Sequence, residues 1–242
     1  DNRYILVGTV RTDGSVNFGP GNKWGIFPSV SAAWRISQES FFNAPAISEL
    51  KLRVETGLTG NQGGGGIYSP LNTGATQWGT GFLPGKYSNP NLQWEETKTD
   101  NIGINIGLLK NRFNIEFDYY VKNTNNLLMD NPLPWYMGTT GQGSVGSPTV
   151  NIGALQNKGW SLTFNTTNIN NKNFTWSSNL NLSGFKTKIK KFYSDAATVD
   201  RVLTYVGGEN TAWTQRSAVD QAPWLFYGYV YDGLFQSIDD IN

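Results

Sequence analysis

The chain has 242 residues with 19 basic and 18 acidic side chains, so its formal net charge is +1 and its electrostatics do not favour a nucleic-acid partner. It contains no histidine and no cysteine, which removes the commonest general base, the commonest metal ligand and every disulfide. No apolar run approaches the ~18 residues that a membrane helix needs, so a helical membrane protein is excluded.

The chain begins with two segments whose apolar residues recur at every second position. The first lies near residues 3–11, and the second, near 23–36, runs from Trp24 to Trp34. At ~3.3 Å per residue and a strand tilt of ~40°, the separation of these tryptophans projects to ~25 Å along a membrane normal. That is the height of the apolar band between the two aromatic girdles of an outer-membrane barrel. The spacing predicts a membrane-crossing β-strand with Trp24 and Trp34 in the girdles.

Further segments alternate in the same way near 49–60, 92–108, 111–128, 149–167 and 173–186, and the last two contribute Trp160 and Trp176 to the girdles. The sequence therefore predicts an all-β protein, an antiparallel transmembrane β-barrel segment of about seven to nine strands. In such a barrel one face of each strand contacts lipid and the other a water-filled lumen. We expect lipid contact for Leu50, Leu52, Val54, Ile104, Ile115, Phe117 and Leu180, and lumen contact for Lys51, Arg53, Asn105, Glu116 and Asn181.

Long and short connections fall on opposite ends of these strands. The long ones are 12–22, 61–91 and 129–148, and the short ones are 109–111 and 168–172. Outer-membrane barrels have short periplasmic turns and longer extracellular loops, which assigns the long connections to the cell exterior. The segment 37–48 then lies on the periplasmic side, where it is longer than usual and has room for a helical turn.

Six aromatic residues in the long connections are candidates for substrate binding: Tyr68, Trp78, Phe82, Tyr87, Trp135 and Tyr136. Aromatic rings of this kind stack on sugar rings or on peptide side chains. Alternatively, they pack on one another within a mobile loop, and the sequence leaves both interpretations open.

Lysines gather where the last of these strands should leave the membrane on the outside, at positions 186, 188, 190 and 191. Such a cluster forms either a solvated rim or a contact with anionic lipopolysaccharide phosphates. The charged residues of the predicted lumen face likewise have three open interpretations: they bind a plug domain, they line a transport path, or they are simply solvated.

Two motifs that suggest other functions lack the context they need. Gly141, Gly143 and Gly146 match the G-x-G-x-x-G dinucleotide fingerprint, but Pro148 and an extended segment follow where a helix is required. Glu95 and Glu96 are adjacent on a predicted strand and therefore point to opposite faces, so they cannot flank one glycosidic bond. No catalytic residue set, cofactor site or metal-ligand set is predicted.

Several blocks of the sequence resemble consecutive blocks of the SusC/RagA family of TonB-linked outer-membrane transporters of Bacteroidetes. They are RTDGSVNFGPGNKWGIFPSVSAAWRIS, LKLRVETGLTGNQ, NPNLQWEETKTDNIGINIGLLKNRFNIEFDYYVKNTNNLL, NIGALQNKGWSLTF and GYVYDGLFQS. They span nearly the whole chain in the family's order. The resemblance implies that residues 1–242 are part of the C-terminal half of a TonB-dependent receptor barrel of about 22 strands. The signal peptide, TonB box, plug and final strands are expected to lie outside this sequence.

The same resemblance implies a function, a location and partners. The protein is expected in the bacterial outer membrane, importing oligosaccharides or peptides, and not to be an enzyme. A SusD-like surface lipoprotein would act as its lid, and the TonB complex would supply energy through the plug and TonB box. Lipid and lipopolysaccharide are expected to contact the barrel, and a homodimer of transporter–lid pairs is a further possibility.

Three alternatives stay open: a self-contained small outer-membrane structural or adhesin barrel, a TonB-dependent siderophore or vitamin receptor, and a soluble carbohydrate-binding β-sandwich. A self-contained barrel requires the strand near 3–11 to pair with the final strand. A sandwich would bury its apolar face between two sheets. The loop lengths and the unclosed ends favour an arc of a larger barrel, whose two edge strands pair with polypeptide outside this numbering.

Overall fold

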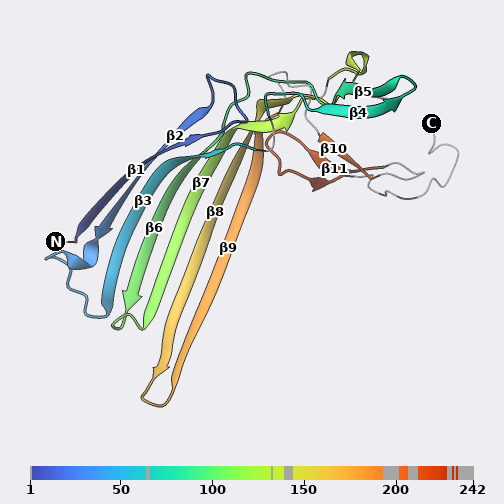
Figure 1. The fold of residues 1–242 in the computed structure, drawn as a ribbon. Coiled ribbons are helices and arrows are strands. Elements are labelled where there is room, and N and C mark those ends of the chain that lie inside the picture. Colours follow the sequence, from blue (N-terminus) through green and yellow to red (C-terminus); the bar gives the residue numbers. More distant parts are fainter. Residues whose placement is uncertain are drawn as a thin grey trace.

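One large antiparallel sheet dominates the computed structural model, which describes residues 2–63, 66–131, 133–138, 144–192, 202–206, 212–227, 231 and 233 (Figure 1). Its seven strands are neighbours in chain order: β1 (Tyr4–Gly14), β2 (Trp24–Arg35), β3 (Ile47–Asn61), β6 (Glu95–Leu108), β7 (Phe113–Asp130), β8 (Thr149–Asn170) and β9 (Thr175–Lys191). Each coincides with a predicted strand, although β9 continues beyond the predicted end at residue 186. No helix in the described part of the chain has the length and hydropathy of a membrane span.

The register of the sheet aligns the alternation of neighbouring strands. One row of directly paired residues consists of Leu52, Ile104, Phe117, Leu162 and Leu182, and the next consists of Arg53, Gly103, Asp118, Ser161 and Ser183. Directly paired residues project to the same side, and successive rows project to opposite sides. The sheet therefore has an apolar face, which carries the Leu52 row, and a polar face, which carries the Arg53 row. The two sets of residues predicted to face in opposite directions do so.

Short connections close one end of the sheet. In the turn between β6 and β7, Leu109, Lys110 and Asn111 have φ values of 51°, 59° and 61°. Three consecutive left-handed residues are unfavourable by roughly 1–2 kcal/mol each. Hydrogen bonds to the preceding connection and to the start of β3 offset part of this cost, because the Leu109 amide donates to the Ala46 carbonyl at 2.9 Å and the Asn111 amide to Ser48 Oγ at 3.2 Å. The same connection begins with the short 3-10 helix η1 (Ile36–Gln38), which is the helical turn that its length suggested.

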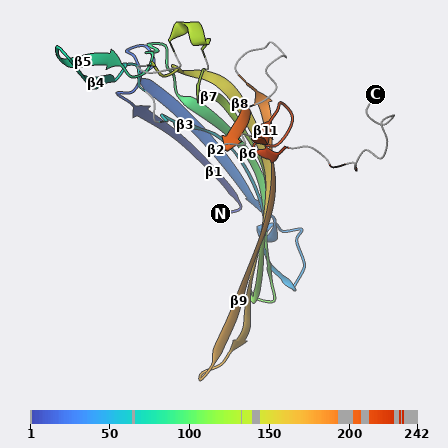
Figure 2. The ribbon, with the colours of Figure 1, turned by 90° about the vertical axis from the view of Figure 1, so that its right-hand side faces the viewer.

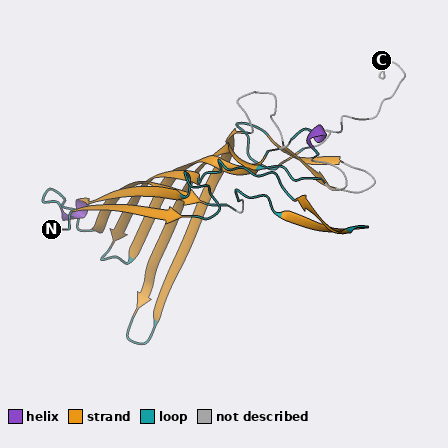
Figure 3. Ribbon diagram, turned by 45° about the horizontal axis from the view of Figure 1, so that its top comes forward, coloured by secondary structure: helices purple, strands orange, loops and turns teal. Residues whose placement is uncertain are grey.

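The opposite end of the sheet carries elements that the sequence did not predict. The connection 61–91 contains a hairpin of β4 (Leu71–Thr76) and β5 (Gly79–Pro84), and the connection 129–148 contains the 3-10 helix η2 (Trp135–Met137). A separate small sheet consists of β10 (Val202–Val206), β11 (Ala212–Ser217) and β12 (Leu225–Phe226). Figure 2 shows that the large sheet is curved and that the small elements gather at one end of it, and Figure 3 shows how few residues are helical.

A compact aromatic core lies at this end, on the polar face. Phe18 and Phe27 are buried, and their rings lie 5.1 and 5.5 Å from that of Trp94. Gly25 and Gly60 leave room for the Phe27 ring, because a Cβ at either position would collide with it. Phe27 shares the face of β2 opposite the two girdle tryptophans with small residues such as Ser29 and Ser31. Its ring is tolerated there because the connections around Phe18 and Trp94 fold over it and exclude water.

Candidate functional site

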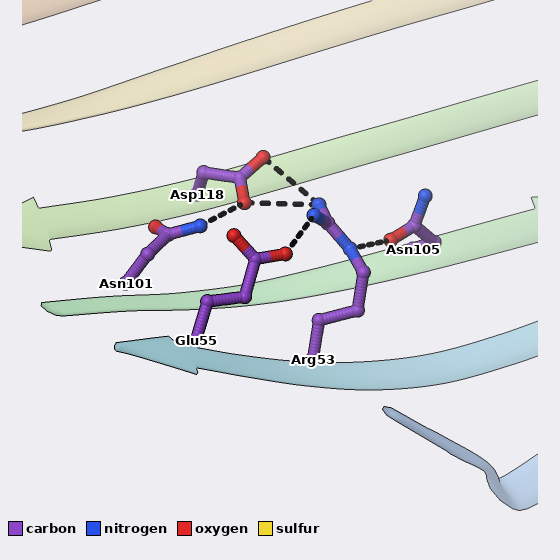
Figure 4. A network of polar contacts seen from close by, with 5 residues as sticks. All are labelled: Arg53, Glu55, Asn101, Asn105 and Asp118. Atoms are coloured by element: carbon purple, nitrogen blue, oxygen red, sulfur yellow. Dashed lines mark hydrogen bonds and ion pairs between the residues drawn. The ribbon is translucent and has the colours of Figure 1, made fainter. Parts of the chain in front are cut away.

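Arg53 is the centre of a polar network in the middle of the polar face (Figure 4). Its Nη2 donates to both carboxylate oxygens of Asp118 at 2.9 and 3.0 Å, and its Nε donates to Asn105 Oδ1 at 2.7 Å. Asn101 donates to the same Asp118 at 3.1 Å, and Glu55 lies 3.5 Å from Arg53 Nη1. The network joins β3, β6 and β7, and it keeps each charge within reach of a partner.

A glycine makes the ion pair geometrically possible. Gly103 stands between Arg53 and Asp118 in their row, so the two side chains meet above a strand that they do not belong to. A Cβ at Gly103 would collide with Asp118 Oδ1 and lie 2.8 Å from Arg53 Nη2. The Arg53 and Asp118 side chains are 23% and 22% exposed, so water screens part of their attraction.

The polar face continues towards the end with the long connections as a surface of amides, hydroxyls and few charges. Asn157 donates to Thr187 Oγ1 at 2.8 Å, and Lys122 lies over the Tyr120 ring at 5.1 Å from its centroid. Such a surface binds water and polar solutes through hydrogen bonds without a strong net charge. Among the described residues, no group of three or more histidine, cysteine, aspartate or glutamate side chains is arranged to hold a metal ion.

The residues assigned to the aromatic girdles lie on the apolar face. Trp24 and Trp34 stand at opposite ends of β2, and Trp160 and Trp176 occupy apolar-face positions on β8 and β9. Trp34 stacks on Tyr4 with ring centroids 6.4 Å apart.

Glu39 ties this aromatic pair to the neighbouring connection. It accepts hydrogen bonds from the Tyr4 hydroxyl at 2.6 Å and from Trp34 Nε1 at 3.0 Å. These two bonds, the first above all, lower the pKa of the Glu39 carboxyl, because they stabilise its ionised form. Tyr4 and Trp34 are therefore held by a specific acceptor, which sequence spacing alone could not show.

The candidate substrate-binding aromatics are widely exposed but do not form one cluster. Trp78 at the tip of the β4–β5 hairpin is 88% exposed, and Tyr68, Phe82 and Tyr136 are exposed as well. Tyr87 is more enclosed and donates from its hydroxyl to the Met137 carbonyl at 2.6 Å. No ring pair among the described side chains joins two of these residues, so they do not pack on one another there. The side chain of Trp135 lies outside the described part of the structure.

Sequence reasoning missed that the two long connections bind each other. Gly146 pairs with Lys86: the Tyr87 amide donates to the Gly146 carbonyl, and the Gly146 amide donates to the Gly85 carbonyl, both at 2.9 Å. Lys86 also forms a 2.5 Å ion pair with Asp130. The connections 61–91 and 129–148, which carry the candidate aromatic residues, are therefore bound to each other. Of the G-x-G-x-x-G glycines, Gly146 serves this contact, and Gly141 and Gly143 lie outside the described residues.

A curved antiparallel sheet with one apolar and one polar face, short turns at one end and long connections at the other, defines a protein of the transmembrane β-barrel class. The comparison with protein families agrees with this architecture, since residues 1–236 match the family described as TonB dependent receptor-like, beta-barrel. The chain belongs to this family, as the resemblance predicted.

Individual relatives fall in the same group. The chain is 36% identical to TonB-dependent receptor P26 of Formosa agariphila over 99% of its own length, and 34% identical to TonB-dependent receptor SusC of Bacteroides thetaiotaomicron over 96%. Among solved structures, the RagAB peptide transporter superposes with a TM-score of 0.78 at 26% identity, over 93% of the chain. In each case the match covers 24% of the relative, so the chain spans about a quarter of the length of these proteins.

Proposed function

We propose that this chain is a section of the barrel wall of an outer-membrane importer. The observation that carries the proposal is an inverted pattern of exposure on the sheet. On the apolar face Phe117, Ile102 and Val54 are 40%, 48% and 50% exposed, whereas the side chains of the Arg53–Asp118 pair on the polar face are 23% and 22% exposed. A water-soluble protein buries its large apolar residues and exposes its charges. This pattern suits an apolar face in lipid and a polar face lining a wet lumen.

The edges of the sheet support an arc within a larger barrel. Among the described strands, β1 pairs with β2 and β9 with β8, and the two edge strands do not pair with each other. Unpaired backbone groups in hydrocarbon cost several kcal/mol each, so further strands must continue both edges in the membrane. The chain's span of about a quarter of its relatives is consistent with this. A plug domain would then pack against the polar face, and TonB would act on that plug.

The import substrate is proposed to be a peptide or an oligosaccharide, delivered beneath a surface lipoprotein lid. Solved relatives include the RagAB peptide importer, which supports the peptide class. The exposed rings of Tyr68, Trp78 and Phe82 suit either class, because aromatic faces stack on sugar rings and on apolar peptide side chains. These rings belong to the long connections, which we assign to the extracellular rim, where a lid subunit would meet them.

Uptake by cells that lack the gene for the full-length protein tests this function. Labelled peptides and labelled oligosaccharides are offered separately, and the gene is restored as wild type, as Trp78→Ala/Phe82→Ala, or as Phe41→Ala. Phe41 is 69% exposed and lies on the proposed periplasmic side, so it is the matched control for loss of an exposed ring. We expect TonB-dependent uptake of one substrate class, several-fold reduced by the double substitution and unchanged by the control.

Two results would contradict the proposal. One is wild-type protein that does not fractionate with the outer membrane. The other is equal uptake of both classes with and without the gene; if a siderophore or vitamin were imported instead, the alternative receptor class would be the better answer.

A further inference from the structure

Four lysines gather on the apolar face of β8 and β9, in the half of these strands nearer the long connections. Lys158 of β8 is paired directly with Lys186 of β9, and Lys188 and Lys190 follow on the same side of β9. All four side chains are exposed. Because they project from the face that we assign to lipid, the proposed lumen and the candidate substrate-binding rings make no use of them.

This lysine cluster is short of negative charge. Like charges directly opposite one another on a sheet are destabilising, and Lys158 and Lys186 are such a pair. Lys190 forms an ion pair with Asp220 at 2.7 Å, whereas no ion pair among the described residues involves Lys158, Lys186 or Lys188. The Lys190 hydrogen bond, with a smaller contribution from the charge of Lys188, lowers the pKa of Asp220, so this one carboxylate is ionised at neutral pH beside a cluster of four lysines.

The row of the apolar face next to the lysines carries two aromatic residues, Trp160 and Tyr119. In this row, Trp160 is paired with Tyr119 on one side and with Gly184 on the other. The indole lies over Gly184, where a Cβ would be only 3.0 Å from Trp160 Nε1. Tyr119, Trp160 and the four lysines together line a groove of about 670 Å³. Leu162 and Leu182 occupy the next row down, so the groove begins where the hydrocarbon-facing rows end.

We propose that Lys158, Lys186 and Lys188 bind the phosphate groups of lipopolysaccharide in the outer leaflet, with its acyl chains against the apolar rows below. The inference rests on the proposed outer-membrane location. A phosphate offers three acceptor oxygens and forms strong bonds to ammonium groups. Paired residues have Cβ atoms about 5 Å apart, which lets Lys158 and Lys186 reach one phosphate from two strands. The bound phosphate removes the repulsion between them, and Trp160 and Tyr119 lie at the interface that these residue types prefer.

Binding is measured on the full-length protein, purified in detergent and stripped of lipid. Wild type is titrated with lipopolysaccharide, with enzymatically dephosphorylated lipopolysaccharide and with inorganic phosphate. Lys158→Gln/Lys186→Gln is compared with Lys110→Gln/Lys172→Gln, which removes the same charge from the turns at the opposite end of the sheet. We expect about tenfold weaker binding of lipopolysaccharide by the first variant and unchanged binding by the control. Dephosphorylation should weaken wild-type binding by a similar factor, and millimolar inorganic phosphate should not displace the glycolipid.

Equal affinity of wild type and Lys158→Gln/Lys186→Gln would overturn the inference, as would displacement by inorganic phosphate alone. Thermal unfolding separates binding from a structural role. Without lipopolysaccharide the variant should unfold at the same temperature as wild type or higher, because the like-charge pair is gone. With lipopolysaccharide wild type should gain more than the variant, and a variant that is less stable in both conditions counts against the inference.

Uptake by cells distinguishes this inference from the proposed function. The variant should import substrate as wild type does, because the lysine cluster lies outside the lumen. Normal uptake combined with equal lipopolysaccharide affinity overturns the inference and leaves the proposed function standing. Wild-type protein that is absent from the outer membrane contradicts the proposed function itself, whatever the titration in detergent gives.

Discussion

The side chains on the two faces of β3, β6 and β7 differ in whether they need specific hydrogen-bond partners. On the apolar face, the side chains of Leu52, Ile104 and Phe117 have no hydrogen-bonding group, so they are stable in contact with hydrocarbon without specific partners. One residue further along each strand, Arg53 and Asp118 reach each other across Gly103 and are held by amide neighbours. A single register therefore suits both solvents at once, and only the polar face requires specific side-chain geometry.

The largest effect should come from putting a charge on the wrong face. Phe117→Arg places a guanidinium on the apolar face, in the row of Ile104 and Leu162, and in a bilayer we expect it to destabilise the full-length protein by roughly 1–4 kcal/mol. Ser183→Arg makes the matched change on the polar face and should stay within about 0.5 kcal/mol of wild type. The free energy of unfolding in lipid vesicles, measured with guanidinium chloride, checks both.

Spin labels provide the same comparison without a charge. A label at Val54 should be protected from aqueous quenchers, and one at Arg53 should be accessible to them. The reverse result would move every face assignment by one residue.

Removing the Arg53 side chain should have the next largest effect. Arg53→Ala leaves Asp118 with Asn101 as its hydrogen-bond partner in the network, and water replaces part of the loss at this partly exposed site, so we expect about 1 kcal/mol of destabilisation. Lys51→Ala removes the looser 3.7 Å pair with Glu49 on the same strand and face and should cost a few tenths of that. Equal effects of the two substitutions would show that the network is no stronger than an ordinary surface pair.

A methyl group at Gly103 should weaken the same ion pair by a steric route. Gly103→Ala pushes against the ends of the Asp118 and Arg53 side chains, which can swing aside, so its cost should not exceed that of Arg53→Ala. In an Arg53→Ala background most of the cost should disappear, because the two changes remove one interaction. Gly8→Ala is the control, since a Cβ there meets nothing within 4 Å. Fully additive free energies of unfolding would contradict a shared mechanism.

The smallest effect concerns pH at the rim of the apolar face. The Tyr4 and Trp34 hydrogen bonds lower the pKa of Glu39, so the folded state binds its proton less tightly than the unfolded state. The stability contribution is therefore fully present above the ordinary carboxyl pKa and is lost as the pH falls through the lowered value. The stability difference between wild type and Glu39→Gln, followed from pH 7 into the acid range, should be constant at first and then vanish. A difference that grows on acidification would reverse the sign of the shift.

The sequence by itself determined the seven long strands, their faces and the ends at which long and short connections lie. These features follow from a period of two residues, which is local and is imposed by the pleat of any strand between two solvents. The family resemblance was equally readable, because long blocks such as LKLRVETGLTGNQ keep their order along the chain.

Tertiary structure decided which side chains meet, because register and loop docking depend on contacts between distant residues. Alternation placed Arg53 and Asp118 on one face, but their pairing across Gly103 needed three strands in register. Phe27 lies on the polar face, and it is buried there because Phe18 and Trp94 close over it. The β4–β5 hairpin is rich in glycine and threonine, so no apolar period marked it. Lys158 joined the lysine cluster only through its pairing with Lys186, a contact between strands that no spacing within one strand reveals.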